Sequence, residues 1–342
     1  RHTRYWRDWS SDVCSSDLEL WSARSNGQIH LTALARTSPS AGPALTITAA
    51  VPDLDHYNAR GGRAFPLWRD RDATIPNLPP KLTAAIAARL QIAVTADDVM
   101  AYVAVVAASP AYTTRFQEDL SQPGLRIPLT ADVNLWNRAV AAGHHVIWLH
   151  TFGERCIDKA AGRPAKPPRL ADADSPQIPK GGTIPSDAEN MPDEMTYDAA
   201  TRTLHVGKGR IENVPPAVWN YEVSGKRVLT QWFSYRKKDR AKPPMGDKRP
   251  PSTLGEIQPD GWLAEYTTEL LNVLHVLGML VKAEPEQAKL LDAICAGPKI
   301  TRGELEAAGT LECPPKWKKS MRAEAASLFD DQHDENGEEH DD

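Results

Sequence analysis

Residues 214–240 read VPPAVWNYEVSGKRVLTQWFSYRKKDR, and this stretch joins an aromatic turn to a helical pattern that ends in positive charge. Pro215 and Pro216 favour a turn or a first helical turn, because proline has a fixed φ and its missing N–H is harmless there. Gly225 permits a bend before the helical pattern begins. The apolar residues that then recur at helical spacing are Val228, Leu229, Trp232 and Phe233. We predict a helix over residues 226–240 whose apolar side packs on the rest of the protein.

Positive side chains flank this apolar stripe at both ends. They are Lys226, Arg227, Arg236, Lys237, Lys238 and Arg240. Between residues 226 and 249, nine Lys and Arg stand against two Asp, which gives a local surplus of +7. A cationic patch of this density predicts an anionic partner, whereas a solvated helix end is the alternative interpretation.

Three aromatic residues of the same stretch are interpreted as structural anchors. Trp219 and Tyr221 flank Asn220 in the turn, and Trp232 lies on the apolar side of the predicted helix. Such large amphipathic rings bury an extensive apolar surface while their polar ends keep a hydrogen-bond partner. We therefore expect the rings to fix the turn and the helix in place.

The composition is that of a soluble globular protein. The 342 residues include 41% hydrophobic and 25% charged residues, enough for one large or two smaller domains with a substantial core. No apolar run reaches the length that crosses a membrane, and no signal peptide is found. The four cysteines are far apart and form no CxxC pair. We predict a reduced, cytoplasmic protein without a membrane partner.

The net charge of −5 combines two regions of opposite sign. Residues 323–342 contain nine acidic residues and no Lys or Arg, so residues 1–322 carry +4. We expect this acidic tail to be disordered, because it is highly charged and poor in apolar residues. The rest of the chain is mildly basic, with its charge concentrated near residues 226–249.

The chain divides into segments of different composition. Residues 1–18 contain WRDWSSDVCSSDL, which resembles a translated adapter or assembly artefact, so we expect them to be non-native and the chain to be a C-terminal piece of a longer protein. The further predicted segments are a β-rich part over 19–75, a helical part over 76–159, a mobile Pro/Gly-rich linker or loop over 160–194, a β-hairpin plus the basic helix over 195–250, C-terminal helices over 260–322 and the acidic tail.

These segments predict an α+β fold, in which small antiparallel sheets accompany a helical subdomain and a C-terminal helical segment. Strands are expected over 28–36, 44–51, 64–68 and 210–214, with a hairpin over 195–206. Helices are expected over 79–92 and 95–108, from Ser109-Pro110 onward and from Thr130 through Trp136. Helices over 262–282 and 285–296 are predicted to be separated by a break at Pro285, with a third over 301–307.

Two groups of potential metal ligands are interpreted as structural. The acidic residues and the histidine of segment 53–56 lack partner ligands at a defined spacing, so a polar loop is favoured. His144, His145 and His150 lack the i, i+4 spacing of a zinc-binding helix and have core-like neighbours. His150 and Glu154 suit a pair on a helix surface. We predict no metal site.

Residues 214–240 also resemble a stretch of the C-terminal specificity domain of type ISP restriction-modification enzymes and related large adenine-N6 DNA methyltransferases, a domain that recognises the DNA target. Further segments resemble the same domain in the same order. They are FPLW at 65–68, IPN at 75–77, VTADDVMAYVAVVAASPAYTTRF, RIPLTADVNLW and residues 143–150. The resemblance runs from about residue 27 to about residue 238. Its specificity comes from several segments matching in order, since none of them is a catalytic motif.

The resemblance implies a larger parent enzyme. Such an enzyme joins a nuclease, an ATP-dependent translocase and an adenine-N6 methyltransferase, and it uses S-adenosylmethionine, ATP and Mg²⁺. The partners implied for this chain are double-stranded DNA and the upstream methyltransferase and translocase domains of the same polypeptide. None of those activities follows from the residues present here.

No catalytic motif is found in this sequence. It has no GxxxxGK[ST] phosphate loop and no [DNS]PP[YFW] tetrapeptide of the kind that amino-methyltransferases use. The nearest segments, 77–80 and 213–216, each have an inserted residue before the two prolines. No nuclease-like cluster of carboxylates with a lysine stands out. We assign no catalytic residue and no cofactor to this chain.

We therefore predict DNA target recognition. The six cations of 226–240 are candidates for phosphate contacts, and Asn220, Arg60 and Arg63 are candidates for reading base edges. Arg60 and Arg63 bracket the Gly61-Gly62 loop, which can approach phosphate closely. Two alternatives stay open: a direct contribution to a methyltransferase core that binds S-adenosylmethionine, and a scaffold that docks on partner domains.

Overall fold

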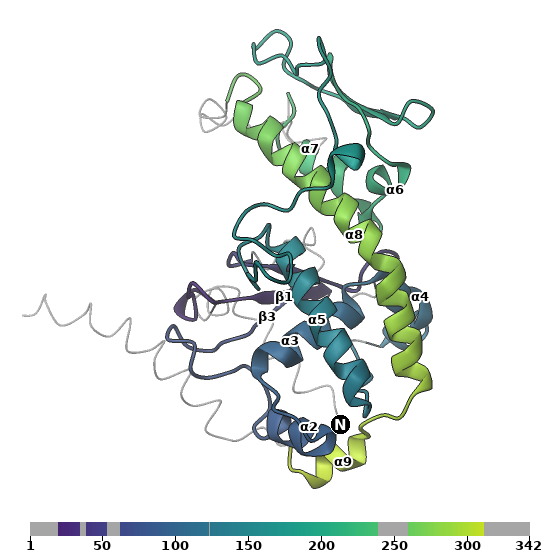
Figure 1. The fold of residues 1–342 in the computed structure, drawn as a ribbon. Helices are drawn as coiled ribbons and strands as arrows, with labels where there is room; N and C mark the ends of the chain where they lie inside the picture. Colours follow the sequence, from purple (N-terminus) through teal and green to yellow (C-terminus); the bar gives the residue numbers. More distant parts are fainter. Residues whose placement is uncertain (1–19, 35–38, 53–61, 123, 239–258, 311–342) are drawn as a thin grey trace, which may run out of the picture.

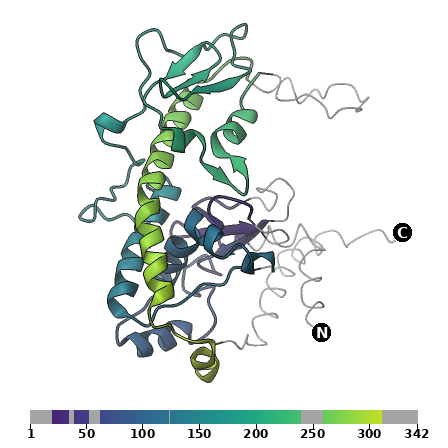
Figure 2. The ribbon, with the colours of Figure 1, turned by 90° about the vertical axis from the view of Figure 1, so that its right-hand side faces the viewer.

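The computed structural model describes residues 20–34, 39–52, 62–122, 124–238 and 259–310. Within them the chain forms helices and antiparallel sheets of two or three strands, which confirms the predicted α+β fold. The long helix α8, Ala264–Ala296, contributes to two hydrophobic clusters. Figure 1 shows the two parts of the molecule one above the other, and Figure 2 shows α8 passing along both. We call the part around the cluster that contains Tyr102 and Trp136 the lower part. The part around the cluster that contains Leu229 and Leu270 is the upper part.

The lower part contains a three-stranded antiparallel sheet in the order β2-β1-β3. Its strands are β1 His30–Leu34, β2 Leu45–Thr48 and β3 Gly62–Pro66. Leu31 lies opposite Ile47, and Ala33 lies opposite Leu45, and all four are buried. Because residues two apart share a face of a strand, these pairs form one apolar face. The three strands predicted here are confirmed, with ends that differ by at most three residues.

Helices of the lower part pack on this sheet and on one another. They are α2 Leu82–Leu90, α3 Ala96–Ala107, α4 Pro110–Arg115, the 3-10 turn η1 Asp119–Ser121, α5 Val133–His150 and α9 Arg302–Ala307. The predicted helix start at Thr95 is confirmed, and the side chains of Thr95 and Asp98 form a capping box there. The start of α5 differs from the prediction, because the side chain of Asp132, rather than of Thr130, accepts from the first-turn N–H groups.

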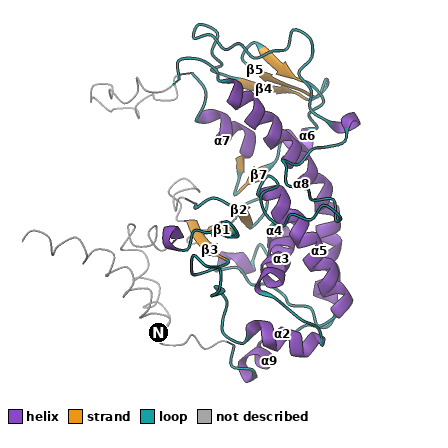
Figure 3. Cartoon of the chain, turned by 60° about the vertical axis from the view of Figure 1, so that its left-hand side comes forward, coloured by secondary structure: helices purple, strands orange, loops and turns teal. Residues whose placement is uncertain are grey.

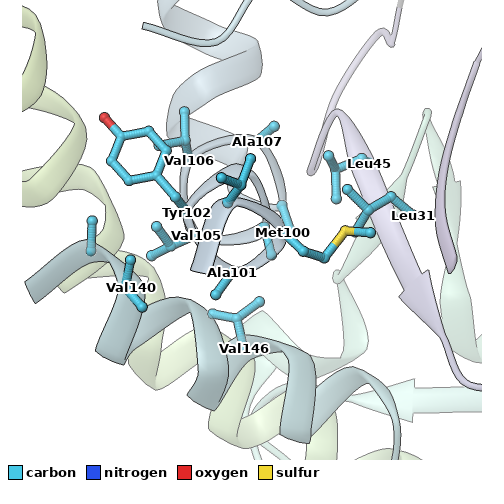
Figure 4. Packing of buried hydrophobic residues seen from close by; sticks show 14 of the residues in the cluster. Leu31, Leu45, Met100, Ala101, Tyr102, Val105, Val106, Ala107, Val140 and Val146 are labelled. Carbon is cyan, nitrogen blue, oxygen red and sulfur yellow. The ribbon is translucent and has the colours of Figure 1, made fainter. Parts of the chain in front are cut away.

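Helices α3 and α5 approach each other very closely. A Cβ atom at Gly143 would lie 1.9 Å from the carbonyl oxygen of Ala101, so a side chain is excluded there. Tyr102 stacks on Trp136 with ring centroids 4.5 Å apart, and its hydroxyl donates to the Pro128 carbonyl at 2.8 Å. Figure 4 shows the packed side chains around this crossing. The helix pair is thus the centre of the lower cluster.

The upper part contains a second antiparallel sheet, in the order β4-β5-β6. Its strands are β4 Met195–Asp198, β5 Thr203–Val206 and β6 Gly209–Ile211, which form the predicted hairpin and the strand after it. The chain continues through α6 Pro216–Trp219, β7 Glu222–Val223, β8 Lys226–Arg227 and α7 Val228–Ser234. Leu229 and Phe233 of α7 are buried in the upper cluster, which confirms that the apolar side of this helix packs on the protein.

Helix α8 continues through Pro285, so the predicted break there is wrong. Proline has no N–H, and the carbonyl of Val281 therefore lacks its usual partner within the helix. The helix persists because both sides of this point are buried, with Leu280 in the upper cluster and Leu290 in the lower cluster.

Despite its length, α8 is not apolar enough to cross a membrane, and neither is any other helix within the described ranges.

Residues 160–194, predicted as a mobile linker or loop, form a loop that packs on the rest of the protein. Its described regular structure is the short 3-10 helix η2, Asp172–Asp174. Leu170, Ile184 and Met191 are buried. Leu170 fits against Gly278 of α8, where a Cβ atom would lie 2.6 Å from Leu170 Cδ1. The loop therefore packs against the helix that joins the two parts.

Two histidines, the buried His30 and the half-buried His150, line one pocket in the lower part. Burial lowers the pKa of His30 from 6.5 to about 4, and it lowers the pKa of His150 equally far. Helix α5 ends at His150, so Glu154 lies outside the helix, and its Oε2 lies 3.7 Å from Arg155 Nη1. The predicted surface pair of His150 with Glu154 is therefore wrong. These two imidazoles stay neutral in the folded protein at pH values where exposed ones are protonated.

Replacement of Gly143 by alanine should lower the free energy of unfolding by about 2 kcal/mol, because the added methyl group collides with the backbone of α3. Urea denaturation followed by tryptophan fluorescence measures the change. Gly303→Ala in α9 is the matched control, since its Cβ would have no neighbour closer than 4.0 Å. The control should keep or slightly raise the stability, and equal losses in the two variants would contradict the close helix contact.

His30 and His150 should make the protein less stable as the pH falls from 6.5 to about 4. In this window the unfolded chain binds protons that the folded chain does not, and each histidine contributes up to about 3 kcal/mol. Urea denaturation at pH 7 and pH 5 measures the difference in unfolding free energy. His150→Gln should make this difference smaller, and an unchanged difference in the variant would show that His150 is not buried in its neutral form.

Candidate nucleic-acid interface

The first two cations of the predicted patch lie on a β-hairpin and not on a helix. Glu222 pairs with Arg227 and Val223 pairs with Lys226, and the two-residue turn between them is Ser224-Gly225. Both turn residues have positive φ, 53° and 76°, as a type I′ hairpin turn requires. The prediction that the helix includes residues 226 and 227 is therefore wrong, since α7 begins at Val228.

The hairpin docks on the loop between β1 and β2. Ser224 donates its N–H to the Ala41 carbonyl at 3.0 Å. Gly42 has a φ of 74°, and a Cβ atom there would lie 1.9 Å from the Glu222 carbonyl oxygen. Only a glycine permits so close an approach. Figure 3 shows β7 between α7 and the strand β2 of the lower sheet, so the hairpin connects the two parts of the molecule.

Lys226 and Arg227 are both exposed, and neither forms an ion pair with any residue in the described part of the chain. The Arg227 guanidinium lies over the Trp219 ring, 5.3 Å from its centroid. Trp219 in turn stacks on Tyr197 with ring centroids 5.4 Å apart. This stack orients the arginine while its hydrogen-bond donors stay accessible to solvent. Lys226 and Arg227 are thus available to an anionic partner.

Arg236 differs from these two cations because it is engaged within the protein. Its Nη2 and Nε atoms donate to Glu269 Oε2 at 2.9 and 3.1 Å. The guanidinium also lies 4.3 Å from the centroid of Trp232 and 5.6 Å from that of Tyr266. Its charge is largely matched by a carboxylate on α8, so the geometry favours a role in fixing α7 to that helix.

Lys238 also contacts the protein itself. Its ammonium group donates to the carbonyls of Ala188 and Glu189 at 3.2 and 3.4 Å, and its N–H donates to the Pro192 carbonyl at 2.7 Å. Lys237, the neighbouring residue, is not free either. These two lysines follow the end of α7, whose seven residues separate them from the hairpin by about 10 Å.

The predicted base-reading residues are in different places. Asn220 is exposed at the C-terminal end of α6, two residues before the hairpin. Arg63 lies on β3 opposite Ala33, it is half-buried and not free, and burial lowers the pKa of its guanidinium. Arg60 and Arg240 lie outside the described residues. Asn220 thus lies close to Lys226 and Arg227 in the sequence, whereas Arg63 belongs to the lower sheet.

The aromatic residues predicted as anchors make the contacts that such a role needs. Tyr221 is buried, and burial raises the pKa of its hydroxyl above its usual range. Trp219 is stacked between Tyr197 and Arg227, and Trp232 packs edge-on against Trp262 with ring centroids 6.1 Å apart. Tyr197 and Trp262 are partners that sequence reasoning did not find, because they come from distant segments.

No group of three or more metal-ligating side chains occurs among the described residues. Segment 53–56, which holds the acidic residues and the histidine weighed as ligands, lies outside them. Cys156 and Cys295 are free thiols, and burial raises the pKa of Cys156 to about 11. A thiol with so high a pKa is a poor nucleophile at neutral pH.

The chain belongs to the Type ISP C-terminal specificity domain family, whose model matches residues 3–272. This confirms the resemblance found in the sequence. Among solved structures, the chain is similar to one described as the cryoEM structure of a DrdV–DNA complex. The two share 17% identity at a TM-score of 0.50, over 80% of this chain and 25% of that one. No curated protein matches.

A nuclease-deletion mutant of the Type ISP restriction-modification enzyme LlaGI, in complex with a DNA substrate mimic, is more distant. It has 17% identity and a TM-score of 0.46, over 77% of this chain and 21% of that one. The chain thus spans about a quarter or less of the length of the solved chains that it matches. At this identity, the likeness to the DrdV structure shows a shared fold.

The contact between Arg236 and Glu269 should appear as a coupling energy of about 1 kcal/mol in a double-mutant cycle of Arg236→Met and Glu269→Gln. The methionine keeps an apolar side chain beside Trp232 while it removes the charge. Free energies of unfolding of the two single variants and the double variant give the coupling. A value near zero would mean that Arg236 is free to bind an external anion.

Proposed function

We propose that this chain recognises DNA targets as the C-terminal specificity domain of a type ISP-like restriction-modification enzyme. The observation that carries the proposal is the match of the specificity-domain family over residues 3–272. The exposed cationic hairpin with Lys226 and Arg227 is consistent with it, because a DNA-binding surface needs cations that are not neutralised within the protein.

Phosphate contact is the role of the cations in this proposal. Lys226 and Arg227 contribute most, because no described residue neutralises them. Lys237 and Lys238 extend the surface beyond α7, and Arg240, outside the described residues, is a further candidate for phosphate contact. Arg236 contributes least, since Glu269 already accepts two of its N–H groups. Each phosphate that is neutralised releases condensed counterions, so the affinity depends steeply on salt.

Base reading is the role of Asn220, Arg60 and Arg63 in this proposal. The amide of Asn220 suits the adjacent donor and acceptor of adenine in the major groove, and its exposed position two residues before the hairpin supports this role. Arginine suits the two acceptors of guanine, so Arg63 on β3 and Arg60, which lies outside the described residues, are the further candidates. Phosphate contacts would fix the position of the DNA, and these side chains would supply its sequence information.

In the complete enzyme, the domain positions the DNA for adenine-N6 methylation and cleavage by upstream domains of the same polypeptide. S-adenosylmethionine, ATP and Mg²⁺ serve those domains, and the enzyme acts in the cytoplasm. Support for this part of the proposal comes from the family alone, because the chain spans only a quarter or less of the solved enzymes that it resembles.

Charge reversal of the hairpin, Lys226→Glu with Arg227→Glu, should weaken binding to all duplex sequences by at least about tenfold near 100 mM salt. The plot of log affinity against log salt should become shallower by about 2. Fluorescence anisotropy with labelled duplexes of several sequences measures both quantities on the complete chain. Circular dichroism verifies that the variant is folded.

The matched control for this experiment is Lys289→Glu with Arg302→Glu, which makes the same charge change on α8 and α9 at the lower end of the molecule. Its salt dependence should equal that of the wild type. If both double variants lose affinity equally, net charge and not the hairpin is responsible. Absence of salt-sensitive DNA binding by the wild-type chain would contradict the proposed function itself.

A further inference from the structure

A polar pocket lies in the lower part, between the start of β1, the end of β2 and the turn after α5. Its volume is about 410 Å³, and its lining includes Arg24, Ser25, His30, Thr48, His150 and Arg155. This volume falls among those of small-molecule sites, which span about 300–1,000 Å³. None of residues 214–238 lines the pocket, so it is separate from the hairpin surface.

Arg155 is a fixed cation in this pocket. Its side chain is 16% exposed, its Nε donates to the Gln28 carbonyl at 2.9 Å, and its Nη1 donates to the Glu154 carbonyl at 3.1 Å. These bonds set the plane of the guanidinium, and no described residue is hydrogen-bonded to Nη2. The nearest carboxylate, Glu154, is 65% exposed and lies 3.7 Å away. Arg155 is therefore oriented but only weakly neutralised.

Three further side chains of the pocket have buried polar atoms without a partner in the described part of the chain. These atoms are Ser25 Oγ, Nε2 of His150 and a ring nitrogen of His30, whose other ring nitrogen faces the Thr48 backbone. His30 is 1% exposed. Buried polar groups in native proteins are nearly always hydrogen-bonded, so a set of unpartnered ones around a cavity points to a ligand. Each neutral imidazole offers one donor and one acceptor.

The charge around the pocket favours an anion. Its charged lining residues are Arg24 and Arg155 against Glu154, a surplus of one positive charge. The C-terminal end of α5 also meets the pocket, but the carbonyls of its last turn are occupied. Those of Ile147, Trp148 and Leu149 accept from the N–H groups of Thr151, Gly153 and Phe152. The partial negative charge of the helix end is thereby reduced.

We propose that this pocket binds a nucleotide through its phosphate group. Arg155 Nη2 is the charged donor, and Ser25 and the two histidines complete the hydrogen bonds. The pocket volume is more than ten times that of one water molecule, about 30 Å³. It therefore has room for the sugar and base of a nucleotide as well as for its phosphate. A base edge presents donors and acceptors together, which matches neutral imidazoles. The phosphate comes either from a free nucleotide or from a DNA strand.

Nuclear magnetic resonance of the histidine ring protons in the complete chain tests this site. The probes are inorganic phosphate, dAMP and a short DNA duplex, each titrated separately. We expect dAMP to shift the His30 and His150 signals. Arg155→Gln should weaken dAMP binding by roughly tenfold, because it removes a charge-assisted hydrogen bond. Since Arg155 also holds Gln28, Ser25→Ala is the second variant, with an expected weakening of about threefold.

The outcomes distinguish a free nucleotide from a DNA strand as the source of the phosphate. They also distinguish this proposal from the proposal that the hairpin binds DNA. Shifts with dAMP but not with the duplex support a free nucleotide, and shifts with the duplex support a DNA strand. Lys226→Glu with Arg227→Glu should leave dAMP binding unchanged, so failure of DNA recognition at the hairpin does not affect this test. No shift of either histidine with any of the three probes overturns the proposed site. Shifts that persist equally in Arg155→Gln and Ser25→Ala overturn it as well.

Discussion

The continuity of helix α8 through Pro285 is the constraint on which the rest of the structure depends. One end of this helix lies in the upper cluster and the other lies in the lower cluster. Gln287, just past the proline, donates to the carbonyls of Val105 and Ala108, both at 3.1 Å. These bonds satisfy carbonyls at the end of α3, so α8 is fixed to the lower part through buried polar contacts. A kink or break at Pro285 would remove this connection between the two clusters.

A second connection between the two parts places the hairpin. Gly42 and Gly225 both have positive φ, and both bring the backbone into close contact across the junction. The hairpin is therefore held from below by the loop between β1 and β2, and from above by α6 and α7. Its cations are presented on a rigid turn, which keeps the entropy cost of binding an anionic partner low. Arg236, in contrast, contributes to the junction between α7 and α8.

The sequence predicted the local features well and the non-local ones poorly. The helix start at Thr95, the start of α4 at Pro110 and the strands around Leu31 and Ile47 depend on neighbours in the chain, and all are present. The break at Pro285 was wrong, because burial of both halves of α8 outweighs the loss of one hydrogen bond. The placement of Lys226 on a helix was wrong, because Ser224-Gly225 is a weaker turn signal than Asn-Gly.

For the candidate site, too, the local features could be predicted from the sequence and the non-local ones could not. The concentration of cations at 226–238 is visible in the sequence, but it does not tell which of them are neutralised. Glu269 is 33 residues from Arg236 in the chain, and Ala188 is 50 residues from Lys238. Partners at such distances are set by the tertiary fold and have no sequence signal. The pocket around Arg155 was likewise missed, since its residues come from three separate segments.

The proposal that the hairpin faces DNA is tested most directly by photo-cross-linking. The complete chain is bound to duplexes that carry photoreactive thymine analogues, and the cross-linked peptides are identified by mass spectrometry. The structure predicts cross-links in residues 219–227, around Trp219, Lys226 and Arg227, that disappear at high salt. Cross-links confined to the lower end of the molecule, in α2 and α9, would contradict the placement of DNA at the hairpin.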